Sequence, residues 1–438
     1  MRAGLLDQLL DDAGMAAIIG DQASLAAMLR AEAALARAQA RLGVIPQPAA
    51  DAIARAADAL RPDPAALSAD VARAGIAAQP VIAALKQAVP DHAAFVHFGA
   101  TSQDITDTGL MVQLSAAVAL LRARLMTLDG LLAAKAGAFA DLPIPAHTRF
   151  QIAAPTTLGA KIAIWRAGLT RQVQRLDEMA PRLLLVSLYG AAGTSAALGS
   201  QAGAIRRDMA ARLGLGVTDM PWHASRDAIA ELGGWLSMMT GLMGKIGADL
   251  VLMGTAWPGA VTAGTGGGSS TMPQKSNPVA AEALISLARL NAGALGTLHQ
   301  AMVHQAERDG SALMIEWATL PDMLIRAAAC LRIGTELAAS LRADPARTHA
   351  AFTADRGRMM AEAAGFALTR DMPRADALAL IAQALGAMQD DPALTLAGAL
   401  DRLAPGRDWA QLLAPEANTG DAARIARQDH NPTGGTTT

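Results

Sequence analysis

Five long stretches with helical signals restrict the folds open to this chain of 438 residues. Alanine and leucine recur through them, whereas aromatic residues make up only 3% and alternating β-branched runs are nearly absent. The predicted helices cover about residues 108–139, 155–179, 227–253, 278–308 and 311–341. Several extend over roughly 25 to 30 residues, or about 40 Å at about 1.5 Å per residue. Such lengths without strict heptads predict an all-α protein built around a long-helix bundle.

Glycine, proline and polar residues interrupt this pattern near residues 100–101, 141–145, 215–221, 264–273 and 340–345. We therefore predict three domains, which are an N-terminal helical domain (1–108), a central helical bundle (109–342) and a smaller C-terminal helical domain (343–438). The segment from Asn431 onwards is polar and is expected to be a frayed tail.

Composition excludes several classes of protein. Hydrophobic residues account for 52% of the chain and charged residues for 17%, which excludes disorder. A formal net charge of −2 gives no reason to expect nucleic acid or an acidic membrane as a partner.

Cys330 cannot form an internal disulfide and is predicted to be a buried small residue in a reducing compartment. The N-terminus lacks a signal-peptide pattern, and the uncharged stretches 183–205 and 250–274 are too polar to span a membrane, so we expect a soluble, cytoplasmic protein.

A glycine-rich segment, residues 264–278, combines a mobile backbone with hydroxyl, ammonium and amide groups. Ser269, Ser270, Lys275 and Asn277 supply these groups, and lysine is otherwise scarce in the chain. They suit a lid that brings a proton-transfer hydroxyl and a cation onto an anionic substrate. The alternative is a flexible linker between helices, although a linker has no need for Met-Pro-Gln-Lys followed by Asn-Pro.

Residues 268–278 resemble the signature loop of the fumarase/aspartase superfamily, Gly-Ser-Ser-x-Met-Pro-x-Lys-x-Asn-Pro, and match it at every fixed position. The resemblance implies that Ser269 transfers the proton at carbon and that Lys275 and Asn277 hold a substrate carboxylate. It also makes Ser270 a substrate-binding candidate. The implied fold has three domains, with a central long-helix bundle that assembles into a tetrameric helical core.

A second cluster precedes the first long helix. Small hydroxyl residues follow a Gly-Ala break there, where helix N–H groups and the helix dipole favour an anion. In the superfamily a similar Thr-Ser-x-Asp turn binds a substrate carboxylate, which makes Thr101, Ser102 and Gln103 binding candidates. The alternative is that Thr101 or Ser102 only caps the helix. His97 is either structural or a proton donor or anion ligand.

A third cluster departs from the superfamily. The usual Arg-Thr-His-x-Gln is replaced by His147-Thr148-Arg149-Phe150-Gln151, so Arg149 stands where hydratases and ammonia lyases have a histidine. This exchange argues against those activities. His147, Arg149 and Gln151 are nevertheless candidates for substrate binding, while a structural ion pair of Arg149 with an acid such as Asp309 is the alternative.

Arg308 is the last residue of the fourth predicted long helix and can grip a carboxylate with two hydrogen bonds. It could instead pair with Glu307 or Asp309 on a helix surface. Further along, Glu-Trp-x-Thr-Leu-Pro at 316–321 is similar to the 3-carboxy-cis,cis-muconate cycloisomerase branch of the superfamily. Segments 189–198 and 221–227 and the start of the chain resemble the same branch.

This branch adds a substrate carboxylate to a double bond within the molecule, and the product is a lactone. The nucleophile is ionised at neutral pH, since carboxylates titrate at about 4, so it needs no base, and the missing superfamily histidine is tolerated. The substrate has three negative charges, which Arg149, Lys275 and Arg308 can match. The eight histidines are scattered and no metal-binding spacing is present, so we expect no metal, and we expect no cofactor. The resemblance implies a homotetramer in which three subunits build each active site. Alternatives are an adenylosuccinate-type or other fumarate-releasing lyase, or an inactive crystallin-like member.

Overall fold

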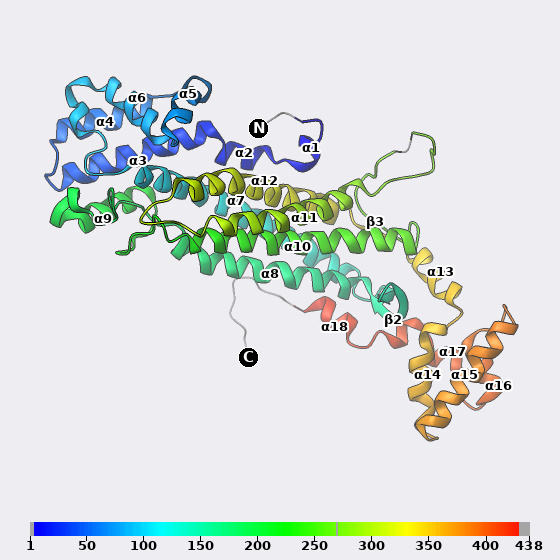
Figure 1. The fold of residues 1–438 in the computed structure, drawn as a ribbon. Helices are drawn as coiled ribbons and strands as arrows, with labels where there is room; N and C mark the ends of the chain where they lie inside the picture. Colours follow the sequence, from blue (N-terminus) through cyan, green and yellow to red (C-terminus); the bar gives the residue numbers. More distant parts are fainter. Residues whose placement is uncertain (1–3, 269, 429–438) are drawn as a thin grey trace. The chain divides into compact units, whose positions relative to one another are not determined.

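The computed structural model describes residues 4–268 and 270–428, most of which are helical (Figure 1). The N-terminal helices are α1 (Asp7–Leu10), α2 (Ala13–Ile19), α3 (Asp21–Arg41), α4 (Gln47–Ala59), α5 (Pro64–Ala74) and α6 (Ala78–Ala88). The next six are α7 (Ser102–Ala138), α8 (Leu158–Leu183), α9 (Ala202–Leu213), α10 (Asp227–Ala256), α11 (Val279–Gln300) and α12 (Gly310–Ser340). The last six are α13 (Pro345–Asp355), α14 (Ala361–Leu368), α15 (Arg374–Asp390), α16 (Leu396–Leu403), α17 (Trp409–Leu412) and α18 (Ala422–Arg427). The strands are β1 (Pro143–Thr148), β2 (Gln151–Thr157), β3 (Val261–Thr262) and β4 (Arg342–Ala343).

The predicted all-α class is confirmed, and each of the five predicted long helices is present. Several of their ends were predicted wrongly, and the helix predicted from residue 108 begins at Ser102 as α7. The helix predicted from residue 155 begins at Leu158 as α8, because Pro155–Thr157 pair with β1 as part of β2. The helix predicted to reach residue 308 ends at Gln300 as α11, and turns and irregular backbone occupy residues 301–309. Cys330 is fully buried in α12, as predicted, and burial raises the pKa of its thiol.

The first of two compact units consists of the described residues of Met1–Leu125, Gln172–Gly244 and Ile285–Arg332. In it α3 packs against α4, α6 and α9. Leu25, Met28 and Leu35 recur at helical spacing and are buried on one face of α3. They share a core with Ile53 of α4 and Leu85 of α6. This core supports the start of α7, which carries the predicted substrate-binding turn.

The second unit consists of the described residues of Met126–Arg171, Lys245–Leu284 and Ile333–Thr438. Strands β1 and β2 form an antiparallel hairpin in which Thr148 pairs with Gln151. The two residues of its turn, Arg149 and Phe150, have left-handed backbone angles with φ of 49° and 63°. Helices α14 to α17 gather around a separate apolar cluster that includes Trp409, which is fully buried (Figure 1).

Among the described residues, α7, α10 and α11 are long and apolar enough to cross a membrane, judged by length and composition alone. Half of the most apolar stretch of α7 and of α10 is buried within the chain, and only 28% of that of α11. These helices therefore carry apolar surface that the single chain leaves uncovered.

Candidate active site

Two predicted site residues meet at the start of α7. The hydroxyl of Thr101 accepts a hydrogen bond of 2.6 Å from Nη1 of Arg308, although about two hundred positions separate them in the sequence. The backbone N–H of Thr101 donates to Oδ2 of Asp104 at 2.9 Å. The Thr101 side chain is thus engaged by a cation, and Ser102 begins the helix directly after it. This arrangement places a guanidinium beside the helix N-terminus, a combination that suits a carboxylate ligand.

Asp104 is fully buried and fixes this turn. Its Oδ1 accepts hydrogen bonds from the backbone N–H of Tyr189 at 2.8 Å and lies 2.7 Å from Nε2 of His223. Its Oδ2 accepts from the N–H of Gly190 at 2.9 Å as well as from Thr101. A carboxylate with several such bonds is strongly held, so the position of the turn depends on the loops that carry Tyr189 and His223.

Gln103 points inward and is only 2% exposed. Its Nε2 donates to Oδ2 of Asp107 at 3.1 Å and to the carbonyl of His223 at 2.8 Å. Asp107 in turn accepts from both terminal nitrogens of Arg226 at 3.0 Å, and Nε of Arg226 donates to Glu316 at 2.9 Å. Burial alone would lower the pKa of Arg226, but the two carboxylates raise it. The amide of Gln103 therefore belongs to a buried ionic network beneath the turn.

His97 lies just before the turn and is held by another buried acid. Its Nδ1 is 2.6 Å from Oε1 of Glu32, which is 1% exposed. The backbone of His97 is left-handed, with φ of 62°. The ring is therefore fixed in one orientation by Glu32, and a role for His97 in substrate binding stays a prediction.

In the second unit, three predicted residues lie on the β1–β2 hairpin. The ring centroid of His147 is 5.0 Å from that of Trp257. Burial and the nearby charge of Lys161 lower the pKa of His147, so the ring is neutral at neutral pH. Arg149 is exposed and forms no ion pair among the described residues of this unit, and Gln151 is also exposed. The hairpin thus presents a free guanidinium beside a neutral imidazole.

The described part of the signature loop is closed by backbone hydrogen bonds between Gly267 and Asn277, of 2.8 Å and 2.7 Å. Gly266 is left-handed, and a β-carbon there would collide with the side chain of Ser276. Lys275 and Ser270 are exposed. Ser269, the predicted proton carrier, lies outside the described residues. The loop residues therefore present their polar groups to solvent within this unit.

Comparison with known proteins decides the family. A model of the lyase family matches residues 12–293, which is more than half of the chain. The chain belongs to the lyase family.

Relatives within this family are similar over nearly the whole chain. The 3-carboxy-cis,cis-muconate cycloisomerase of Pseudomonas aeruginosa is 41% identical over 386 residues, covering 86% of this chain and 84% of that protein. A crystal structure of the 3-carboxy-cis,cis-muconate lactonizing enzyme from Pseudomonas putida has a TM-score of 0.92 and 36% identity, covering 96% of this chain and 97% of the other. Nitrosuccinate lyase of Streptomyces davaonensis is 34% identical over 87% of this chain and 84% of its own length. The predicted superfamily membership is confirmed, and this lyase-family chain is an enzyme.

The sequence did not reveal the roles of Asp104, His223, Arg226 and Glu316. In the sequence, Asp104 indicates only a helix cap, and the segments that contain His223, Arg226 and Glu316 show only a likeness to one branch of the superfamily. A signal was present, because an Asp three residues after a helix-capping Thr often accepts the hydrogen bond of that residue's N–H group. The partners from the other segments could not be read in this way, since they lie up to about two hundred positions away.

Proposed function

We propose that this lyase-family enzyme converts 3-carboxy-cis,cis-muconate to 4-carboxymuconolactone, a step in the breakdown of protocatechuate. The observation that carries the proposal is the likeness to relatives named for this reaction. Three of them are 38–41% identical to this chain over 86% of its length. The matches cover 84–92% of the length of these relatives.

The reaction is an isomerisation, so atoms and electrons balance within one molecule and one proton. A substrate carboxylate forms a C–O bond to one carbon of a C=C bond, and the π electrons move towards a neighbouring carboxylate as an aci-carboxylate. A proton then adds at carbon. Donors that stabilise the aci-carboxylate lower the barrier, since charge develops there in the transition state.

We assign the proton transfer to Ser269 and the stabilisation of the aci-carboxylate to Lys275 and Asn277. This assignment rests on the signature-loop resemblance. It is supported by the exposed position of Lys275 and by the backbone pairing of Asn277 with Gly267, which holds the loop in a closed turn. Ser270 is assigned a hydrogen bond to the same carboxylate.

A second carboxylate is assigned to Thr101, Ser102 and Arg308. The 2.6 Å hydrogen bond between Arg308 and Thr101 supports this, because it aims a guanidinium at the start of α7 and leaves further N–H groups for a ligand. The third carboxylate is assigned to Arg149, which is exposed and unpaired among the described residues, with His147 and Gln151 beside it on the hairpin. Each of the three substrate carboxylates is thus assigned to one cationic side chain, Lys275, Arg308 or Arg149.

The enzyme is proposed to be a homotetramer in which the turn, the hairpin and the signature loop of each active site come from three subunits. The apolar surface left open on α7, α10 and α11 supports such a partner, because water-exposed helices of this composition are unfavourable. A soluble, cytoplasmic tetramer without nucleic-acid or membrane partners, metal or cofactor remains our expectation. Sedimentation that gives a stable, active monomer would contradict the shared site.

Turnover of 3-carboxy-cis,cis-muconate, followed as loss of its conjugated-diene absorbance, tests the activity directly. A second candidate is a lyase that releases fumarate, which the likeness to nitrosuccinate lyase and to a fumarate lyase structure from Mesorhizobium (TM-score 0.89, 30% identity) favours. Formation of fumarate from a succinyl adduct, without turnover of the muconate, would support that candidate. Absence of both activities would support an inactive, crystallin-like member.

A further inference from the structure

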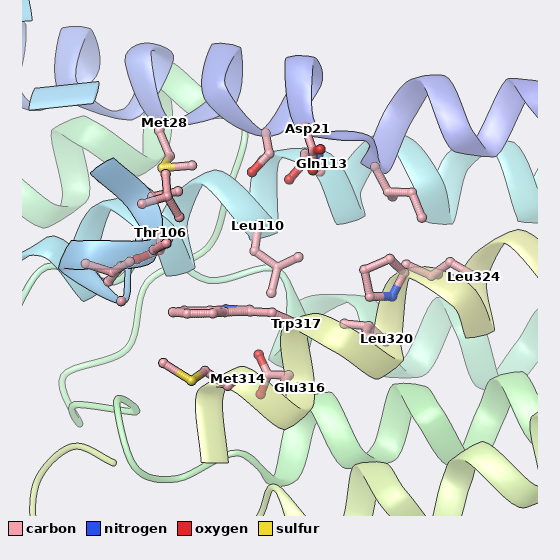
Figure 2. Close-up of a pocket in the computed structure, with 18 residues that line it drawn as sticks. Asp21, Met28, Thr106, Leu110, Gln113, Met314, Glu316, Trp317, Leu320 and Leu324 are labelled. Carbon is pink, nitrogen blue, oxygen red and sulfur yellow. The ribbon is translucent and has the colours of Figure 1, made fainter. Parts of the chain in front are cut away.

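A cavity of about 430 Å³ lies within the first unit, apart from the residues assigned to the substrate. Its walls come from the start of α3, the α5–α6 segment, α7 and α12 (Figure 2). This volume falls in the range of about 300–1,000 Å³ that is usual for small-molecule sites. The cavity is therefore large enough for a ligand with one ring and a short side chain.

The walls of the cavity are mostly apolar. Met28, Leu110, Met314 and Leu324 line it, and the ring of Trp317 extends flat into the space between them (Figure 2). Trp317 belongs to the Glu-Trp-x-Thr-Leu-Pro segment, which the proposed reaction does not use. A flat aromatic face beside methionine side chains suits a ring or a branched aliphatic group.

Two polar side chains in the cavity wall, Thr106 and Gln113, each donate to a backbone carbonyl. Thr106 donates its hydroxyl proton to the carbonyl of Ser102 at 2.7 Å, and Nε2 of Gln113 donates to the carbonyl of Ile18 at 2.9 Å. The hydroxyl oxygen of Thr106 and Oε1 of Gln113 remain as acceptors. Pro321, also in the wall, has no N–H, so the carbonyl four residues earlier loses its usual helical donor. These oxygens can therefore accept hydrogen bonds from a ligand that carries donors.

The charged side chains that line the cavity, Asp21 and Glu316, are both acidic. Asp21 is exposed and forms no ion pair among the described residues, whereas the carboxylate of Glu316 is paired with Arg226, which also binds Asp107. The residues that line the cavity include no lysine, arginine or histidine. In Figure 2, Asp21 and Gln113 lie together at one end of the space, with the Trp317 ring below them. This field repels an anion such as the tricarboxylate substrate.

We propose that this cavity binds a small organic cation, a protonated amine with an aromatic or branched aliphatic body. The apolar body packs against Trp317 and the methionines, and the ammonium group donates to Asp21 and Gln113. An ammonium near the face of a tryptophan also gains a cation–π attraction. The site is distinct in charge from the active site and does not depend on which reaction the enzyme catalyses.

Calorimetric titration of the full-length protein tests the proposal with three probes of matched shape. They are 2-phenylethylammonium, neutral 2-phenylethanol and anionic 3-phenylpropionate. We expect saturable binding of the cation, weaker binding of the alcohol and no binding of the anion. Absence of cation binding at millimolar concentration would overturn the proposal, and so would binding of the anion with equal affinity. If a second copy of the chain fills the cavity, the cation will not bind, and that result overturns the proposal.

Two variants locate the site. Trp317→Leu is expected to weaken cation binding about tenfold through loss of the aromatic face, and Asp21→Asn about fivefold through loss of the charge. The matched control is Asp376→Asn, since Asp376 is also exposed in the first turn of a helix but belongs to the other unit. It should leave binding unchanged. Equal affinities for Asp21→Asn and Asp376→Asn, in proteins with unchanged melting, would refute the assignment of the ammonium to Asp21.

Discussion

The turn at the start of α7 and the signature loop are both assigned to substrate, yet they are built in opposite ways. The turn is supported from beneath by buried charges, with Asp104 and Arg226 at 0% and 2% exposure. The described part of the loop is held mainly by the backbone pairing of Gly267 and Asn277, and Lys275 is exposed. A buried ionic network fixes geometry at a cost in desolvation, whereas a glycine-rich loop allows closure over a ligand. If the proposed roles hold, substrate binding at the turn uses a rigid support, whereas proton transfer uses a glycine-rich loop.

The largest effect is expected at the loop. Ser269→Ala should lower kcat by about 10²–10⁴ or more, with a smaller effect on KM, because a proton-transfer group acts in the transition state. Steady-state turnover of the muconate measures this. Ser270→Ala is the control, since it removes a neighbouring hydroxyl that is assigned only to binding. Turnover close to wild type in Ser269→Ala would reject it as the proton carrier.

The next comparison uses two variants, of which one should lower stability and the other should lower turnover. Arg226→Met removes the partner of two buried carboxylates, Asp107 and Glu316, and should lower the free energy of unfolding by about 3–5 kcal/mol. Lys275→Met should lower turnover strongly while it changes stability by no more than about 0.5 kcal/mol, because the side chain is exposed. Urea unfolding and turnover are measured on both proteins. Similar stabilities would mean that the turn is not anchored by the buried network.

Substitution of Arg149 tests whether this hairpin residue serves substrate binding without affecting stability, as expected of the exposed loop, or stabilises the fold, as the buried charges beneath the turn do. Arg149→Ala should raise KM about tenfold or more by loss of a charge-assisted hydrogen bond, while kcat changes less. The melting temperature should stay unchanged, since Arg149 is exposed and forms no ion pair among the described residues. A lower melting temperature with unchanged KM would instead make Arg149 structural. Arg149→His should not create fumarase activity, because the leaving-group acid must also be repositioned.

Much of the fold could be predicted because helix signals are local. Alanine-rich and leucine-rich stretches placed α10 and α12 within a few residues of their observed ends, whereas the start of α7 and the ends of α8 and α11 were displaced. Residues 155–157 have no helix-breaking signal strong enough to outweigh their composition, and only pairing with β1 makes them a strand. Proline at 155 was compatible with both states, since it is tolerated at helix starts and on sheet edges.

The site was predictable where one short segment carries the pattern and unpredictable where segments meet. The signature loop and the Thr101 turn could be found from the sequence alone, although the roles of their residues remain predictions. The bond from Arg308 to Thr101 and the contacts of Asp104 with His223 join distant segments. The three-domain division also remains a prediction, because the two compact units are each assembled from three separate stretches of the chain.

The smallest effect is expected from His147 and concerns pH. Burial, and then the charge of Lys161, lower the pKa of His147 in the folded protein below its usual value of 6.5. The unfolded chain therefore binds a proton more readily, and this group favours folding fully above about pH 6.5. Its contribution is lost as the pH falls from 6.5 through the lower folded pKa. His147→Gln should melt with a shallower loss of stability between neutral and mildly acidic pH than wild type, and His349→Gln, at an exposed histidine of the same unit, should not. Parallel melting curves for the wild-type protein and His147→Gln would show that the hairpin leaves His147 as open to water as Arg149.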